Sequence, residues 1–435
     1  MAAAIDQPLQ PFCQVAEKMF SKGIVDPFRA KAWKRLLQIG WPDKKNEAFT
    51  YVPMRQLYSL EYPLAESISI DPDLIDAYIL PECKESVIVF VDGSFSQQLS
   101  CVSALPLSVA IRSLQEAQKG SYASFLQRRY QQRLEIEEDP FVLLNLAMSH
   151  EGAFIFIPPH IELACPIQCL FVYTQRNASS FPKVQIAAGA HSKLSLITTS
   201  AYLNGADKGL SSALIDIGLD EGSYFSHTVS TDNPADVWGF YAVRASLKKK
   251  SKLDCKNLVT GGKNSRQDYR FTLVGEGADA CVTGLGFLEK NQQAHVHVIV
   301  DHQAPSCTSN QFFKTVLSDV SRSSFTGKIL VRQQAQKTQA YQLNNSLLLT
   351  EGTIANSKPG LEILADDVKA SHGATVSQLD EDQLFYLKTR GLSQETAKHL
   401  LVLGFCNDIV DRIETPSVKN QILLSIKKYL QQQNV

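Results

Sequence analysis

Short apolar runs separated by polar or glycine-containing turns fill the centre of the chain, from about residue 152 to residue 365. The runs are rich in Val, Ile, Leu and Phe, and few helical patterns lie between them. Such runs predict strands, so we expect an all-β central domain. The periodicity alone does not separate a sandwich from a barrel or a β-helix, and no exact repeat is visible. The clearest runs are AFIFIP, PIQCLFVY, KVQIAAG, KLSLITTS, SALIDIGL, DYRFTLVG, HVHVIVDH and LEILA.

The parts of the chain on either side of this domain are predicted to be helical. Before it, Asp26-Pro27 is a helix start signal and Gly40 a stop signal. A short strand and turn are expected near 86–93, and a second helical stretch with one polar face over 107–146. We therefore expect a mostly helical region over 1–150.

A carboxy-terminal helical region is expected over 366–435, after a β domain over 151–365. Asp380, with Gln383 three positions later, predicts a capping box at the start of one helix. Ser393 is the expected cap of the next helix. Thr415-Pro416 is expected to open the last one.

Composition narrows the classes of function. The chain has 43 basic and 44 acidic residues and a net charge of −1, so nothing draws it as a whole to nucleic acid or to an anionic membrane. No run approaches the ~20 apolar residues of a membrane helix. Residues 1–10 lack the basic and apolar pattern of an export signal, and we expect a cytoplasmic protein. The nine cysteines are then expected to be reduced thiols.

Motifs for nucleotide binding and acid–base catalysis are missing. The sequence has no Walker A motif, and Gly275-Glu276-Gly277 lacks the third glycine of a dinucleotide loop. Any coupled ATP hydrolysis must therefore come from a partner. Asp366 and Asp367 are adjacent, so on a regular strand they would face opposite sides and could not act on one bond. His295 and His297 would share one face of a strand, but surface or turn-lining positions are expected more often than a metal site there.

The segment 325–390 carries an ordered series of short motifs that resembles the SufB/SufD family. It runs from a Gly-Lys strand through Gln-x-Asn and Lys-Pro-x-Leu-Glu-Ile to a Ser-His-Gly-Ala-Thr turn and a Leu-Phe-Tyr-Leu helix. The matching residues are Gly327-Lys328, Ala335–Thr338, Gln342-Leu343-Asn344, Leu347–Leu349, Lys358–Ile363, Asp366–Lys369, Ser371–Thr375 and Leu384–Gly391. Residues 40–51 resemble an amino-terminal element of the family more weakly, with Phe49 where Trp is usual.

The resemblance implies a mainly β fold, a right-handed parallel β-helix between helical ends. Chain size and the long amino-terminal region are more similar to SufD than to its paralogue SufB. It further implies a non-enzymatic scaffold for iron–sulfur cluster assembly, working with SufB and the ATPase SufC. Any iron–sulfur cluster would be bound only transiently and shared with the partner, and none would be bound by this chain alone. Whether the isolated chain forms a homodimer stays open. The implied SufC contact comprises Leu384, Phe385, Tyr386, Leu387, Arg390 and Gly391.

His372 is the metal-ligand candidate that the resemblance selects, at the junction with SufB. Neutral imidazole is a good ligand for iron, and Gly373 permits a tight turn beside it. Many family members have Cys two residues earlier, where this chain has Ala370. SufB would then supply every sulfur ligand.

Two alternatives stay open. One is a SufB-like scaffold that carries the cluster itself, for which Cys255, Cys281 or Cys307 would have to accept sulfur. The other is a β-helix enzyme acting on polysaccharide, which needs a cluster of acids or bases that the sequence does not show.

Overall fold

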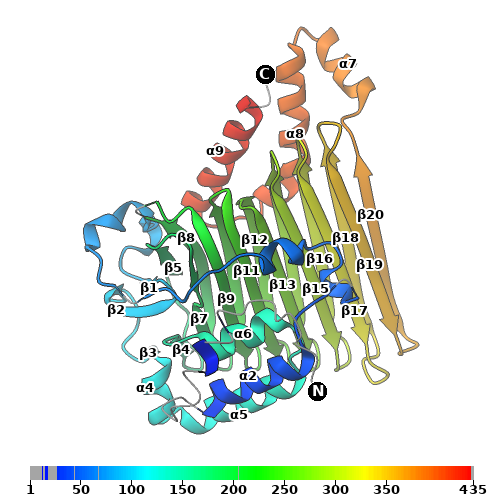
Figure 1. The fold of residues 1–435 in the computed structure, drawn as a ribbon. Coiled ribbons are helices and arrows are strands. Elements are labelled where there is room, and N and C mark those ends of the chain that lie inside the picture. Colours follow the sequence, from blue (N-terminus) through cyan, green and yellow to red (C-terminus); the bar gives the residue numbers. More distant parts are fainter. Residues whose placement is uncertain are drawn as a thin grey trace, which may run out of the picture.

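Two parallel sheets packed against each other form a β-solenoid at the centre of the protein (Figure 1). The structure is a computed structural model, and it describes residues 12, 15–17, 27–43, 45–66, 68–203 and 205–432. From β7 onward the chain alternates between the sheets, so that even-numbered strands lie in one sheet and odd-numbered strands in the other. The core strands are β4 (Ala153–Ile157), β5 (Ile167–Tyr173), β7 (Lys183–Ala188), β8 (Lys193–Tyr202), β9 (Lys208–Leu219), β10 (Tyr224–Asn233), β11 (Asp236–Leu247), β12 (Lys252–Gly261), β13 (Asn264–Leu273), β14 (Asp279–Leu288), β15 (Gln293–His302), β16 (Thr308–Leu317), β17 (Arg322–Val331), β18 (Thr338–Leu348), β19 (Ile354–Ile363) and β20 (Val368–Ser377).

Neighbouring turns of the solenoid stack in register, and each turn takes about 30 residues, as between Gln342 on β18 and His372 on β20. The first sheet runs β2-β1-β5-β8-β10-β12-β14-β16-β18-β20, and the second runs β19-β17-β15-β13-β11-β9-β7-β4-β3, with β6 (Ala178–Ser180) beside β9. Side chains alternate along each strand, so every second residue points into the space between the sheets. The expected mainly β, parallel β-helix fold is confirmed.

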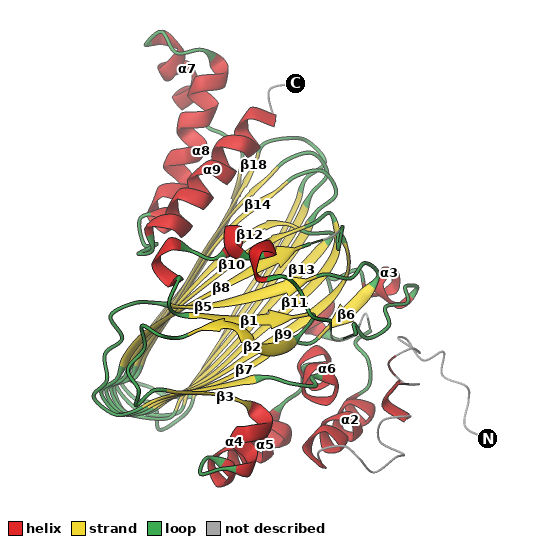
Figure 2. Cartoon of the chain, turned by 90° about the vertical axis from the view of Figure 1, so that its left-hand side faces the viewer, coloured by secondary structure: helices red, strands yellow, loops and turns green. Residues whose placement is uncertain are grey.

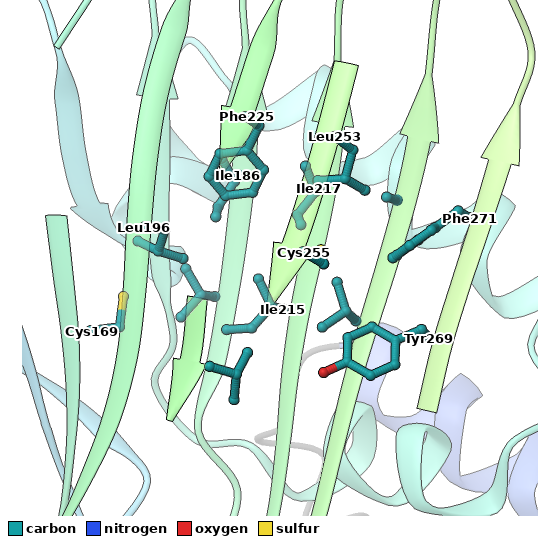
Figure 3. Close-up of a cluster of buried hydrophobic side chains, with 14 of the residues drawn as sticks. Cys169, Ile186, Leu196, Ile215, Ile217, Phe225, Leu253, Cys255, Tyr269 and Phe271 are labelled. Atoms are coloured by element: carbon teal, nitrogen blue, oxygen red, sulfur yellow. The ribbon is translucent and has the colours of Figure 1, made fainter. Parts of the chain in front are cut away.

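The space between the sheets is a continuous apolar core (Figure 3). Leu196, Phe225 and Leu253 enter it from one sheet, and Ile215 and Tyr269 from the other. Closely stacked turns hide these side chains from water almost completely, and such burial stabilises by about 25 cal/mol per Å² of apolar surface. Each turn therefore depends on its neighbours to complete its core.

Helices cover the outward faces of both sheets at different ends of the solenoid (Figure 2). The amino-terminal helices pack on the sheet that contains β7, β9 and β11. The rings of Phe141 and Phe240 stack there, with 3.6 Å between their centres. The carboxy-terminal helices pack on the other sheet through residues such as Val402 and Ile426. The helices are α2 (Pro27–Ile39), α3 (Met54–Tyr58), α4 (Leu114–Lys119), α5 (Ala123–Ile136), α6 (Pro140–Met148), α7 (Glu381–Thr389), α8 (Gln394–Val410) and α9 (Pro416–Gln432).

Several local signals in the sequence are confirmed. Gly40 follows α2 with a φ of 75°, and Asp380 and Ser393 accept hydrogen bonds from the backbone N–H groups of Gln383 and Thr396. Asp26 and residues 1–10, on which two of the predictions rest, lie outside the described residues. No helix within the described ranges is long and apolar enough to cross a bilayer.

Two regions differ from the sequence expectation. The expected short strand and turn near 86–93 form as β1 (Val87–Val91) and Asp92-Gly93, but the chain then continues into two strands that were not predicted, β2 (Ser94–Cys101), which completes a hairpin, and β3 (Ala110–Ser113), which lies in the stretch expected to be helical. Residues 368–377, expected in the helical region and partly as a turn, form β20 instead. This strand lacks an apolar alternation because no further turn covers it, so its sequence does not show a strand pattern.

Candidate functional site

The solenoid ends at β19 and β20 without a covering turn (Figure 1). The inward residues one turn earlier are buried, and Ser346 on β18 is 2% exposed. Its register partner on β20, Val376, is 49% exposed. Among the inward residues of β20, His372 and Ala374 are also exposed, and Ala370 is half-buried. The last turn thus presents core-type side chains and an unpaired strand edge to solvent.

His372 lies on this edge, at the end of a ladder of inward-facing residues. The ladder runs strand by strand from His227 through Cys255, Val282, Gln311 and Gln342 to His372. Within the part of the chain that the structure describes, no hydrogen bond is made by the imidazole of His372. The ring is therefore free to bind a group that approaches the open end.

A hollow of about 680 Å³ opens beside this edge, along the outward side of the last even-numbered strands. Asp408 and Arg412, near the end of α8, form its opposite wall. Its lining is Asn310, Phe312, Tyr341, Gln342, Leu343, Ser371, His372, Gly373, Asp408 and Arg412. The hollow mixes aromatic and charged groups, as protein-docking surfaces do.

No set of metal ligands is complete in the described residues. They contain no group of three or more His, Cys, Asp or Glu side chains that could hold a metal ion. His372 brings one nitrogen ligand, and Ala370 beside it brings none. The described residues alone therefore do not complete a set of three such ligands at His372.

The histidine pair of β15 is buried, so the expected surface or turn-lining position of these two residues is wrong. His295 and His297 project from the outward face of β15 and are 4% and 7% exposed. Nδ1 of His295 lies 2.7 Å from Oγ of Ser324, and Nδ1 of His297 lies 2.6 Å from a carboxylate oxygen of Asp268. These contacts hold the two rings to different partners, which argues against a shared metal.

The cysteines weighed as sulfur acceptors are neutral thiols. Burial raises the pKa of Cys255 well above its usual value, and burial with the carboxylate of Asp254 raises the pKa of Cys281 to about 11. Burial likewise raises the pKa of Cys307, whose thiol donates to the carbonyl oxygen of Gly275. Because the thiolate is the nucleophile and metal ligand, these positions do not favour a SufB-like chemistry.

The Gly275-Glu276-Gly277 segment and the adjacent aspartates Asp366 and Asp367 both lie in turns between strands of the solenoid. Gly275 packs so closely on the backbone of Lys249 that a side chain would collide there. Asp367 donates its backbone N–H to Oε1 of Gln336, and its carbonyl accepts from Lys337. These residues therefore make turns, and no paired-carboxylate site forms.

Helix α7 projects from the body of the protein beyond α8 (Figure 1). None of its described residues is buried, and Phe385 and Tyr386 are 68% and 55% exposed. The guanidinium of Arg390 lies 5.0 Å from the ring centre of Tyr386. Gly391 ends the helix with a φ of 88°. An exposed aromatic pair on a projecting helix is a typical protein-docking feature.

Sequence reasoning missed two groups of residues. One is the pair Gln311 and Gln342 behind His372, which a search for polar residues spaced by one turn would have found. The other is a buried ion-pair network of Glu137, Arg244 and Asp268 between α5 and the solenoid. These residues are far apart in sequence, and no local motif connects them.

Comparison with known proteins gives two matches to family models that together span most of the chain. Residues 171–405 match the SUF system FeS cluster assembly, SufBD core domain, and residues 12–169 match the SufBD protein N-terminal region. The chain is 28% identical over 393 residues to an iron–sulfur cluster assembly SufBD family protein of Synechocystis sp., covering 88% of this chain and 86% of that one. It is 27% identical over 408 residues to the iron–sulfur cluster assembly protein SufD of Escherichia coli K12, covering 91% of each.

Proposed function

The chain belongs to the SufBD family of iron–sulfur cluster assembly proteins, and from this premise we propose that it is a SufD-type scaffold subunit, working with a SufB paralogue and the SufC ATPase. Its relatives are named as assembly proteins and not as enzymes. In this role the chain contributes a surface and one ligand to a cluster that is built as cargo, and it holds no cluster alone.

The observation that carries the proposal is the uncovered last turn with His372 on its edge. A free strand edge with exposed core-type side chains is a template for pairing with another strand. The partner that fits best is a second solenoid of the same family, because its own last turn would continue both sheets and cover the exposed inward residues. The partner proposed here is a SufB paralogue.

His372 is proposed to be the iron ligand that this chain brings to that junction. A neutral imidazole nitrogen binds iron, whereas Ala370 offers no sulfur ligand. The described residues form no group of three or more His, Cys, Asp or Glu side chains around His372. The remaining ligands, including every thiolate, would therefore come from the SufB paralogue.

The exposed face of α7 is the proposed SufC contact. Leu384 and Leu387 are half-buried, and Phe385 and Tyr386 extend the apolar surface into solvent. We place the complex in the cytoplasm. This agrees with the eight cysteines among the described residues, all of which are free thiols, as expected in a reducing compartment.

The first experiment tests His372. The chain is co-purified with SufB and SufC, and iron and acid-labile sulfide are measured for the wild type and for His372→Ala. The matched control is His160→Ala, an exposed histidine in a corner near the opposite end of the solenoid, stacked on His191. We expect the complex to form in all three, with cluster content reduced only in His372→Ala. Equal cluster content in all three would make His372 a structural residue.

The second experiment tests the docking edge. Val376→Lys places a charge among the exposed inward side chains of β20, where it opposes pairing with another solenoid. Thr375→Lys places the same charge on the outward side of the same strand. We expect co-purification of SufB to fail with the first variant and persist with the second. If SufB binds both variants equally and only self-association of the chain is lost, the edge is a homodimer interface and the SufB assignment is wrong.

A further inference from the structure

Two buried glutamines lie directly behind His372 on the inward ladder. Gln311 on β16 and Gln342 on β18 are register partners, and they are 0% and 3% exposed. Nε2 of Gln342 donates a hydrogen bond of 2.6 Å to Oε1 of Gln311. Side-chain amides in register on parallel strands form such ladders, which fix the orientation of each amide plane.

The direction of this hydrogen bond leaves one acceptor facing the open end. Oε1 of Gln342 is buried and has no hydrogen-bond partner within the described residues. In a primary amide the carbonyl points away from the N–H that lies trans to it. Nε2 of Gln342 lies on the side of β16, and β20 lies on the other side of β18, one strand spacing of about 4.8 Å away. The residue opposite it there is His372.

The opposite sheet is shaped to hold this amide in place. Gly327 on β17 lies against the side chain of Gln342, and a Cβ at that position would collide with Nε2 of the amide. Gly327 and Gln342 both fall in the motif series that identifies the family by sequence, yet neither reaches the exposed edge. The contact between Gly327 and Gln342 therefore lies between the two sheets, one strand behind His372.

We propose that Gln342 is the positioning residue for His372, an inference that rests on the proposed role of His372 as an iron ligand. The structure does not contain this contact; when the imidazole of His372 turns toward β18, Oε1 of Gln342 accepts a hydrogen bond from one ring N–H and so fixes which nitrogen carries the proton. The other nitrogen then faces the open end with its lone pair available. A buried carbonyl without a hydrogen-bond partner is unfavourable, so the contact also satisfies Gln342.

The expected loss of iron affinity follows from the effect that such hydrogen bonds have at metal sites in general. A histidine ligand nearly always donates its second ring N–H to an oxygen acceptor, and loss of that acceptor weakens metal binding or activity by about 10- to 100-fold. Gln342→Leu removes the acceptor at similar volume. Gln342→Glu keeps an acceptor toward His372 while losing the donor toward Gln311. The control is Gln339→Leu, the same change at an exposed outward position of the same strand.

Two readouts separate positioning from structural support. Two-bond ¹H–¹⁵N spectra of the full-length chain with labelled histidine report the tautomer of His372, whose signal is assigned from its absence in His372→Ala. We expect a single tautomer in the wild type, in Gln339→Leu and in Gln342→Glu, and a mixture in Gln342→Leu. Iron affinity of the complex with SufB and SufC should fall about 10- to 100-fold in Gln342→Leu and be largely kept in Gln342→Glu.

The outcomes are distinct. An unchanged tautomer in Gln342→Leu overturns the inference whatever the iron content. A changed tautomer with iron lost in His372→Ala but kept in Gln342→Leu overturns the positioning role. A changed tautomer with iron kept in both variants supports the contact between the two side chains and overturns the proposed function of His372.

Discussion

Replacement of Arg244 by Met should release the amino-terminal helices from the solenoid. Arg244 is fully buried on the outward face of β11, and its guanidinium donates to Glu137 at 2.8 and 3.0 Å. It also pairs with Asp268 on β13. Glu137 follows the last residue of α5, so this side chain joins the helical region to the β domain. The Met side chain fills similar volume and leaves both carboxylates without their main partner.

The expected loss is about 3–5 kcal/mol of the free energy that holds this region folded, the usual result of removing one member of a buried ion pair. The pKa of Glu137 gives a consistent figure. Burial alone would raise that pKa, but the charges of Arg244 and Arg270 lower it from 4.5 to about 2. At 1.36 kcal/mol for each pH unit, the net stabilisation of the Glu137 carboxylate by burial and all of its cationic neighbours together is about 3 kcal/mol. Burial also opposes ionisation of Asp268, yet Arg244 and Arg266 hold its pKa well below the usual value.

Hydrogen exchange with mass spectrometry during a urea titration is the suitable assay, because it measures the opening of α5 and α6 separately from that of the solenoid. The control is Arg176→Met, which removes the exposed pair between Arg176 and Asp207. Exposed pairs contribute about 0–1 kcal/mol, so this variant should unfold like the wild type. If Arg244→Met also loses less than about 1 kcal/mol, the buried network does not hold the two regions together and the reasoning fails.

Three further predictions use the same structure. Because the folded pKa of Glu137 lies below its unfolded value of 4.5, its contribution to the free energy of unfolding is complete above pH 4.5 and is lost as the pH falls toward 2. In Glu137→Gln the free energy of unfolding, measured between pH 2 and pH 7, should lose that part of its pH dependence. Gly327→Ala should cost about 1–3 kcal/mol in thermal unfolding, because the added methyl group displaces the amide of Gln342, and an unchanged melting temperature would contradict the packing described. Phe385→Ser with Tyr386→Ser should abolish co-purification of SufC without changing the melting temperature, since both side chains are exposed, whereas intact SufC binding would move that contact elsewhere.

The sequence predicted the interior of the fold better than its ends. Strands such as β5 and β15 are apolar because turns cover them on both sides, and their runs were readable one by one. The sequence of β20 could not be read as a strand, because its inward positions hold Ala370, His372 and Ala374 and no covering turn selects for apolar residues there. The parallel stacking came from the family resemblance, since alternation along one strand does not say which strand lies beside it.

The residues of the candidate site also differ in how far the sequence alone revealed them. His372 was found from a local motif. Gln342 falls in the same motif series, but its relation to His372, like that of Gln311, exists only once the turns are stacked in register. The pair Glu137 and Arg244 is likewise invisible locally, since the two residues are 107 positions apart and meet only when α5 docks on β11. Long-range register and docking are the properties that a single sequence conveys least.

Two histidines on the inward ladder, one inside it and one at its open end, show why position decides what a histidine can do. His227 occupies the same ladder as His372, but turns cover it on both sides. Burial, with the charge of Lys256, lowers the pKa of His227 to about 3, and its Nε2 lies 3.1 Å from the hydroxyl of Thr198. A histidine in the interior is thus neutral and committed to the core. His372 has the same residue type and the same inward direction, but its solenoid stops before covering it. The open end, and not the histidine alone, is what makes this ladder position available to a partner.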